Sequence, residues 1–216
     1  MEFLDLSPYR YLPAPMPMVS IGWLGLEHGI QGGDRRPMEP AEVERLLAAS
    51  THTVSVTMGR HECEFCPEAS AFQGNGEYHY YVADGEVYAA PVMLPHYVRD
   101  HGYRLPEEFR KALGATGRLA WDDRAELLCR MLADDSRDHV ERSRAISDLA
   151  RWQDPRALRA LLAAAADPEF AGIAGTEIGE ALAFLIGCDF AADLNVDDLP
   201  ADVQYGISLH RPPPSP

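Results

Sequence analysis

The sequence predicts an α+β protein in which a small module with a β-hairpin precedes a module made only of helices. Two runs rich in Tyr and Val flank Asp84-Gly85, a dipeptide that is typical of a tight hairpin turn. From residue 115 onward the apolar residues recur at the helical period. We therefore expect an α+β module at 1–114, a helical module at 115–205 and a flexible Pro-rich tail at 206–216.

The N-terminal module begins with a segment, 1–19, that is rich in Pro and Met and has few helix or strand signals. We expect this segment to pack as an arm over other parts of the chain. The apolar run 20–26 and the β-branched run 51–58 predict strands. Between them Pro40 opens a predicted helix over 41–49, because the first helical position needs no amide donor.

The hairpin follows, with predicted strands over 77–83 and 86–93. Pro95 then begins a helix that reaches His101 and ends at Gly102. A second short helix is expected over 105–113. A change of composition after it, at 114–118, predicts a linker.

Four helices are expected in the C-terminal module. The first two cover 121–133 and 138–152, and the apolar residues of each form a stripe along one face. Asp154-Pro155 supplies a cap and a first helical residue for the third helix, and Asp167-Pro168 repeats that signal. Thr176 is expected to cap the fourth helix.

Part of this module resembles a HEAT-like helical repeat. The matching residues are Arg144-Ala145, Leu149, Asp154-Pro155-Arg156-Ala157 and Leu161. The resemblance implies antiparallel helix pairs stacked side by side, a scaffold used mostly to bind other proteins. At most two units fit, fewer than a free solenoid needs. A plain helical bundle is the alternative.

The net charge restricts the class of partner. The chain has 19 basic and 34 acidic residues, a formal charge of −15. Phosphate backbones would be repelled, so general binding to nucleic acid is not expected, whereas a basic protein is a suitable partner. Residues 160–210 contain nine acidic residues and no Lys or Arg. We expect seven of these acids to contact a partner: Asp167, Glu169, Glu177, Glu180, Asp193, Asp197 and Asp198.

Two cysteines and two histidines form a candidate metal site in the N-terminal module. Cys63 and Cys66 are spaced as a CxxC, and His96 and His101 lie on the predicted helix after the hairpin. Two thiolates and two imidazoles form a complete tetrahedral set for a structural Zn²⁺. Residues five apart on an ideal helix point about 140° away from each other, so convergence requires a distorted last turn, which Gly102 permits. His61 and His79 are reserve ligands.

Two other interpretations of the CxxC remain open. The cysteines can be a reduced pair in a turn, with the two histidines on a helix surface. They can also be a redox pair, although that function favours a CxxC at a helix N-terminus, and here Pro67 and a Gly-Asn-Gly turn follow.

Four segments of the N-terminal module resemble a family of largely uncharacterised bacterial proteins that is common in actinobacteria. The segments are 61–66 with its CxxC, Gly74-Asn75-Gly76-Glu77, Tyr88-Ala89-Ala90-Pro91 and His96-Tyr97-x3-His101-Gly102-Tyr103-x2-Pro106; Trp23 and Gly25 match an early Gly-Trp-Leu segment. Leu105 departs from the family, which has a second proline there. The resemblance covers 20–113. It implies that Cys63, Cys66, His96 and His101 act as one unit, and it implies no activity.

No HExxH, P-loop, GxSxG or complete GxGxxG occurs in the sequence. We therefore expect a non-catalytic cytoplasmic protein without a membrane span, either an acidic adaptor or an immunity-type factor that masks a basic partner such as a toxin. One alternative is a small hydrolase-like zinc enzyme with an open site near the CxxC, where Glu62, Glu64 or Glu77 acts as a base. A third is a regulatory module that associates with nucleic acid.

Overall fold

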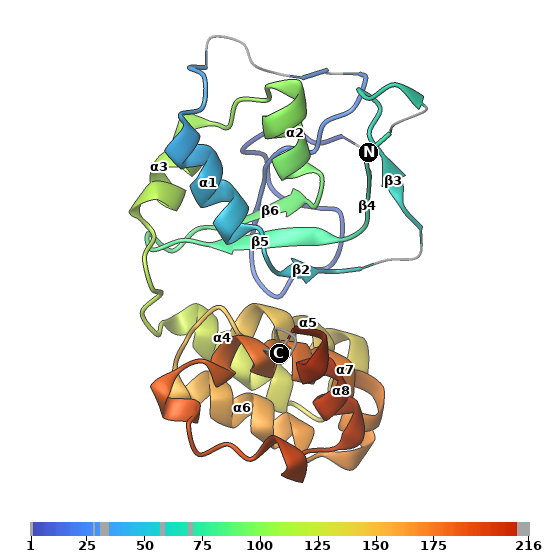
Figure 1. Cartoon of the computed structure of the whole chain (residues 1–216), viewed down its shortest axis with the longest axis vertical. Helices are drawn as coiled ribbons and strands as arrows, with labels where there is room; N and C mark the ends of the chain where they lie inside the picture. Colours follow the sequence, from blue (N-terminus) through green and yellow to red (C-terminus); the bar gives the residue numbers. More distant parts are fainter. Residues whose placement is uncertain (1, 28, 31–34, 57–58, 69–70, 211–216) are drawn as a thin grey trace, which may run out of the picture. The chain divides into compact units, whose positions relative to one another are not determined.

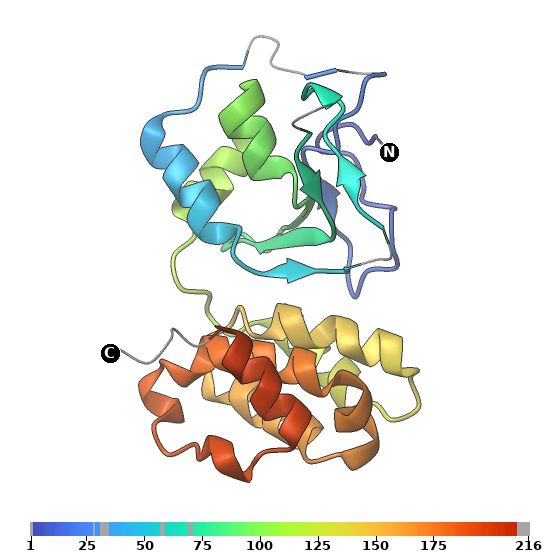
Figure 2. The ribbon, with the colours of Figure 1, turned by 45° about the vertical axis from the view of Figure 1, so that its right-hand side comes forward.

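The computed structural model describes residues 2–27, 29–30, 35–56, 59–68 and 71–210, and these residues form two compact units. Unit 1 is Met1–Gly117 and unit 2 is Arg118–Pro216. The division falls within the stretch 114–118, where the composition changes. Unit 1 contains the β-structure and three helices, and unit 2 is helical (Figures 1 and 2).

A four-stranded sheet in the order β1-β6-β5-β2 forms the centre of unit 1. Strands β5 (Glu77–Tyr81) and β6 (Val87–Pro91) pair antiparallel and confirm the predicted hairpin. Gly85 occupies the turn with a φ of 101°, a backbone angle that favours glycine. Strand β1 (Val19–Ser20) pairs parallel with β6, and β2 (Thr53–Val54) pairs antiparallel with β5.

The two outer strands are shorter than the sequence predicts. The predicted strand over 20–26 is only Val19–Ser20, because the chain turns at Gly22, where φ is 68°. The predicted strand over 51–58 is only Thr53–Val54, because Ser55 has a φ of 53° and leaves the extended conformation. Residues 57–58 of that prediction lie outside the described residues.

Three helices pack on one face of the sheet: α1 (Pro40–Ala49), α2 (Leu94–His101) and α3 (Glu107–Ala115). They share one apolar core with the strands, and Figure 1 shows α1 and α2 over β5 and β6. The fully buried residues of this core include Leu46, Leu94, Tyr103, Leu105 and Phe109.

The N-terminal segment packs as an arm around Trp23, as the sequence predicts. The rings of Phe3, Tyr9 and Tyr11 lie 5.5, 6.0 and 5.2 Å from the Trp23 ring between centroids. The Tyr9 hydroxyl donates to the buried Glu77 carboxylate at 2.7 and 2.8 Å. Burial, together with the charge of Glu77, raises the pKa of Tyr9 and keeps this donor protonated.

The described residues of unit 2, 118–210, form five helices and two short 3₁₀ turns. The helices are α4 (Asp123–Ala133), α5 (His139–Leu149), α6 (Pro155–Ala165), α7 (Pro168–Ile186) and α8 (Ala201–His210). The 3₁₀ turns, Asp189–Ala191 and Val196–Asp198, lie between α7 and α8. Four of the helices begin at a capping aspartate whose side chain accepts from backbone amides: Asp122, Asp138, Asp154 and Asp167.

Helix α7 has non-helical backbone angles at Ala174, so the chain kinks shortly before Thr176, where the sequence predicts a new helix. Helix α8 is not predicted by the sequence. It continues to His210, so residues 206–210 are helical where a flexible tail had been expected; residues 211–216 of that tail lie outside the described residues.

Helices α7 and α8 approach each other through glycines. A Cβ added to Gly179 would lie 2.1 Å from the carbonyl oxygen of Val203, and one added to Gly206 would lie 2.1 Å from the carbonyl oxygen of Thr176. These short distances mean that the backbones of α7 and α8 are in close contact at both glycines, with no room for a side chain. The pair therefore depends on glycine at these positions.

Within the part of the chain that the structure describes, no helix is long and apolar enough to cross a membrane.

Candidate metal centre

Cys63 and Cys66 lie in the turn of a short β-ribbon. Its strands are β3 (His61–Glu62) and β4 (Gln73–Gly74), which pair antiparallel. The amide of Cys63 donates to the carbonyl of Phe72 at 2.8 Å, which continues the ribbon by one pair, and the amide of Cys66 donates to the carbonyl of Cys63 at 3.3 Å. The turn places both thiols on the side of α2, and Figure 1 shows the ribbon beside that helix.

Helix α2 supplies the two histidines, from its first turn and its last residue. The helix ends where Gly102 adopts a left-handed conformation with a φ of 68°, and the amide of Tyr103 donates back to the carbonyl of Tyr97. The imidazoles of His96 and His101 are nearly perpendicular, at 87°, with their centroids 4.7 Å apart. Each ring presents its Nε2 to the other, and the two atoms are 3.1 Å apart.

The four ligand atoms lie close together, and the distances of four of their six pairs are close to those of a tetrahedral zinc site. The Nε2 of His101 lies 3.3 Å from the Sγ of Cys63 and 3.3 Å from the Sγ of Cys66, and the Nε2 of His96 lies 3.4 Å from the Sγ of Cys66. All four atoms lie within 4.8 Å of one another. A tetrahedral ion with the usual Zn–S and Zn–N bond lengths would give about 3.5 Å between sulfur and nitrogen and about 3.3 Å between the nitrogens. The four residues could therefore hold a metal ion.

Neighbouring side chains fix the orientation of His96. Its Nδ1 donates to Asp100 Oδ2 at 2.6 Å, which leaves Nε2 with its lone pair directed at the thiols. The ring of Phe72 stacks on His96, with centroids 4.5 Å apart and planes 15° apart. Arg99 binds both oxygens of Asp100 and lowers the pKa of that carboxyl to about 2, so Asp100 stays ionised.

The environment of the ligands favours neutral groups. Burial raises the pKa of the Cys63 thiol, because a buried thiolate loses its hydration. Burial also lowers the pKa of His101, and the adjacent His96 adds to this effect. A neutral imidazole is ready to bind a cation, and a cation in turn stabilises the thiolate form of cysteine.

The reserve histidines do not join the site. His61 lies in β3 and His79 in β5, and the one group of three or more metal-type ligands found among the described residues contains neither. Two supporting side chains are absent from the sequence prediction, Asp100 and Phe72. Asp100 follows His96 by four residues, and this spacing on a predicted helix could have indicated it; Phe72 had no such signal.

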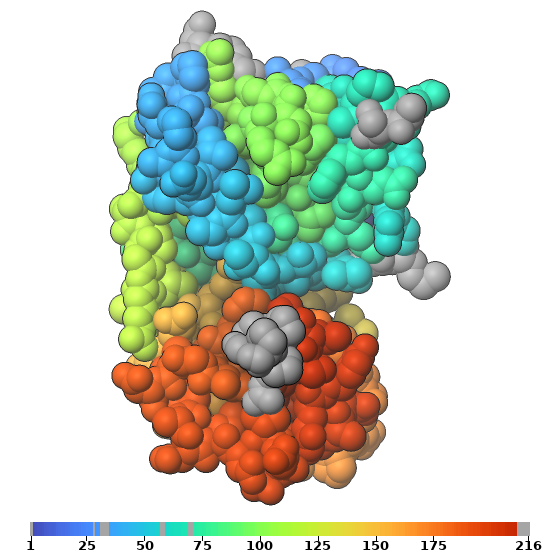
Figure 3. Space-filling model, in the orientation of Figure 1, coloured from blue at the N-terminus to red at the C-terminus, as the bar shows by residue number. Residues whose placement is uncertain are grey.

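The acidic residues expected to contact a partner lie in unit 2. Asp167 caps α7 and pairs with Arg142 at 3.3 Å, and Glu180 lies 3.7 Å from the His210 ring. The other five are exposed and have no ion-pair partner among the described residues: Glu169, Glu177, Asp193, Asp197 and Asp198. In Figure 3 the orange and red atoms of the last helices fill most of the face of unit 2 that this view shows.

Residues 1–114 match the model of a family described as a domain of unknown function, DUF7919. The chain belongs to that family. All four residues of the candidate metal centre lie within the DUF7919 match, whereas unit 2 lies outside it. No curated protein and no solved structure matches the chain.

Proposed function

We propose that this DUF7919 protein is a non-catalytic binding protein: a structural Zn²⁺ stabilises unit 1, and the acidic surface of unit 2 masks a basic protein partner. The partner is of the kind that an immunity-type factor neutralises, such as a toxin. The observation that carries the proposal is the set of exposed carboxylates in α7 and in the loop between α7 and α8, which form no ion pair with another described residue.

The donor set favours zinc and a structural role. Zn²⁺ prefers tetrahedral sites of thiolate and imidazole, whereas Mg²⁺ and Ca²⁺ prefer oxygen ligands. Four protein ligands leave no position for a reacting water. Two of the ligands come from a ribbon with two-residue strands, and two come from α2. An ion shared between them would fasten a ribbon that its few hydrogen bonds stabilise only weakly.

The charge of unit 2 favours a basic partner. Exposed carboxylates without counter-charges repel one another, and a basic protein surface relieves that repulsion. Charge of this kind mainly accelerates association and excludes acidic competitors. The helices of unit 2 suit such a surface, since the stretch 144–161, which lies in α5 and α6, resembles part of a HEAT-like repeat in its sequence. We place this interaction in the cytoplasm, where the four cysteines remain free thiols or metal ligands.

The two alternatives have less support. An enzyme would need a ligand position open to substrate, and the hollow that the cysteine ribbon walls is lined by none of the four ligand residues. A nucleic-acid module would need a basic surface, and the formal charge is −15.

The proposed function is tested by capturing the binding partner and then measuring its affinity for variants that lack acidic residues of unit 2. Purified protein loaded with zinc is used to capture binding proteins from a lysate of its source cell, and the captured protein is then purified and titrated. We expect a basic partner whose affinity falls about tenfold or more in Asp193→Asn/Asp197→Asn/Asp198→Asn and falls with added salt. The control carries Glu44→Gln, Glu68→Gln and Glu108→Gln in unit 1 and has the same net charge. Equal affinities of the two variants, or an acidic partner, would contradict the proposal.

A further inference from the structure

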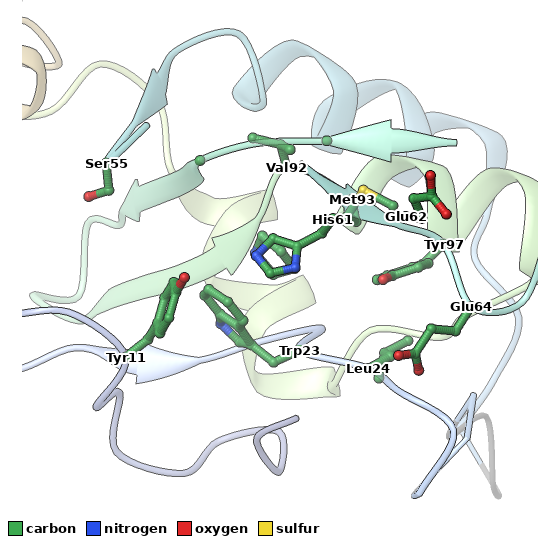
Figure 4. Close-up of a pocket in the computed structure, with 13 residues that line it drawn as sticks. Tyr11, Trp23, Leu24, Ser55, His61, Glu62, Glu64, Val92, Met93 and Tyr97 are labelled. Carbon is green, nitrogen blue, oxygen red and sulfur yellow. The ribbon is translucent and has the colours of Figure 1, made fainter. Parts of the chain in front are cut away.

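A hollow on unit 1 is walled by the ribbon that holds the cysteines (Figure 4). Its volume, measured to its open mouth, is about 640 Å³. The ribbon contributes His61, Glu62 and Glu64, which flank Cys63 in the sequence. Tyr11 and Trp23 come from the N-terminal segment, and Tyr97 comes from α2. In Figure 4 the His61 ring lies between Tyr11 and Trp23 on one side and Tyr97 and the glutamates on the other.

The lining combines aromatic rings with negative charge. Two of its residues are acidic, Glu62 and Glu64, and it contains no Lys or Arg. Glu62 accepts through Oε1 from the Gln73 amide, and Glu64 accepts through Oε2 from the Leu26 backbone amide. The second oxygen of each carboxylate has no hydrogen-bond donor within the described ranges of the chain. Both acids can therefore accept from a ligand without losing the contacts that position them.

The aromatic side chains that line the hollow from the N-terminal segment, Trp23 and Tyr11, are held in place by packing and hydrogen bonding. Trp23 is 6% exposed, and its indole N–H donates to the carbonyl of Ala89 at 3.0 Å. The ring of Tyr11 meets it edge-on at 5.2 Å. A fixed Trp ring with carboxylates across a hollow is an arrangement that attracts organic cations, because the ring face is electron-rich and the acids supply the counter-charge.

The spacing of the acids and of His61 does not favour a bare metal ion, and the size of the hollow suits a small organic cation. Apart from the cysteine and histidine centre, no group of three or more metal-type ligands occurs in the described parts of the chain, so His61, Glu62 and Glu64 do not converge on one point. The hollow, about 640 Å³ to its open mouth, has room for a guanidinium or alkylammonium head group together with bound water.

We propose that this hollow is a binding site for a small organic cation, a guanidinium or alkylammonium group. The cation can come from a free amine metabolite or from a basic side chain of another protein. All residues of the site belong to unit 1, and the site does not depend on the proposed masking function. Since Glu62 and Glu64 flank Cys63, the shape of the site depends on the same turn that presents the thiols to α2.

The test titrates methylguanidinium, and methylurea as its neutral isostere, into the zinc-loaded full-length chain at constant ionic strength. The signal is the NMR resonance of the Trp23 indole N–H. We expect saturable shifts with a Kd on the order of 1 mM for methylguanidinium and none for methylurea. Shifts of Trp23 but not of Trp121 or Trp152 place the cation in the hollow. No saturation below roughly 50 mM, or equal binding of methylurea, would overturn the proposal.

Matched variants test the role of charge. Glu62→Gln and Glu64→Gln each keep the acceptor oxygen that positions the side chain, replace the second oxygen with an amide NH2 and remove one charge, and we expect each to weaken methylguanidinium binding about fivefold. Glu68→Gln removes an exposed charge nearby that does not line the hollow, and it should leave the affinity unchanged. If all three variants bind alike, the acids do not recognise the cation and the proposal fails.

A pentapeptide with one arginine between glycines identifies the source of the cation. Binding about tenfold tighter than that of methylguanidinium indicates a protein side chain, since the backbone then adds contacts. Binding no tighter indicates a free small molecule. Both results support a cation site, whereas tighter binding of the same peptide with citrulline in place of arginine contradicts it.

Discussion

Replacing Gly179 with alanine tests how the acidic surface of unit 2 is held together. Gly179 lies in α7 where that helix meets α8. An added Cβ would lie 2.1 Å from the carbonyl oxygen of Val203 and 2.8 Å from both the Cα of Gly206 and the amide nitrogen of Ile207. All three are backbone atoms, so no side-chain rotation relieves the contacts, and α8 must move away from α7.

The cost follows from what α8 buries. Restoring an ordinary contact of about 3.4 Å requires a shift of more than about 1 Å, which opens the packing around Val203 and Ile207. These side chains are 0% and 1% exposed. Burial of each contributes roughly 1.5–3 kcal/mol, and overpacking itself costs about 1–3 kcal/mol. We expect a loss of about 3 kcal/mol or more, which lowers Tm by roughly 12–24 °C for a domain of this size.

Gly172 provides the control, because it lies in the same helix and a Cβ there would meet nothing within 4 Å. Gly172→Ala should raise the stability by up to about 1 kcal/mol, as alanine favours helix. Both variants are compared with the parent by urea unfolding and thermal melting, followed by circular dichroism. A loss below about 1 kcal/mol for Gly179→Ala, or equal effects of the two changes, would refute the close packing of α7 on α8.

Three further predictions concern unit 1. Asp100→Asn removes the carboxylate that orients His96, and zinc affinity measured by chelator competition should fall about 10–100-fold, while Glu108→Gln leaves it unchanged. Cys66→Ser should abolish stoichiometric zinc binding and lower the Tm of unit 1; retention of both would exclude Cys66 as a ligand. Glu42 binds Arg110 at 2.6 Å, and Arg36 and Arg110 hold its pKa at about 2, below the ordinary 4.5. Its stabilisation, roughly 1–3 kcal/mol, is therefore present above pH 4.5 and lost as the pH falls towards 2. Urea unfolding of the metal-free parent and Glu42→Gln should differ at pH 6 and converge near pH 2; a constant difference would contradict the ion pair.

The elements with strong local signals could be predicted from the sequence. Asp84-Gly85 favours a tight turn, and the hairpin of β5 and β6 forms around it, although the connection is longer than the two residues predicted, because the paired strands end at Tyr81 and Val87. Gly102 similarly marks the end of α2, and the structure places it in the left-handed conformation that ends the helix. The four metal-type ligands could be predicted from the CxxC spacing and from the His pair on the predicted helix after the hairpin, and the structure brings them together.

Elements that depend on tertiary contacts could not be predicted. The ribbon of β3 and β4 has two residues in each strand, too few to show alternation. Helix α8 has only three buried residues, Val203, Gly206 and Ile207. These few positions do not form an apolar stripe long enough to predict a helix from the sequence. The hollow beside the ribbon joins residues as distant as Tyr11 and Tyr97, a proximity that only the folded chain creates.

X-ray absorption at the zinc edge, on protein purified without added metal, tests the central claim most directly. One zinc per chain, with two sulfur ligands near 2.3 Å, two nitrogen ligands near 2.0 Å and no oxygen ligand, is the predicted result. Loss of the sulfur signal in Cys63→Ser/Cys66→Ser would assign it to these thiols. Protein that binds no zinc, or a spectrum with oxygen in place of one of the four ligands, would contradict a closed structural site.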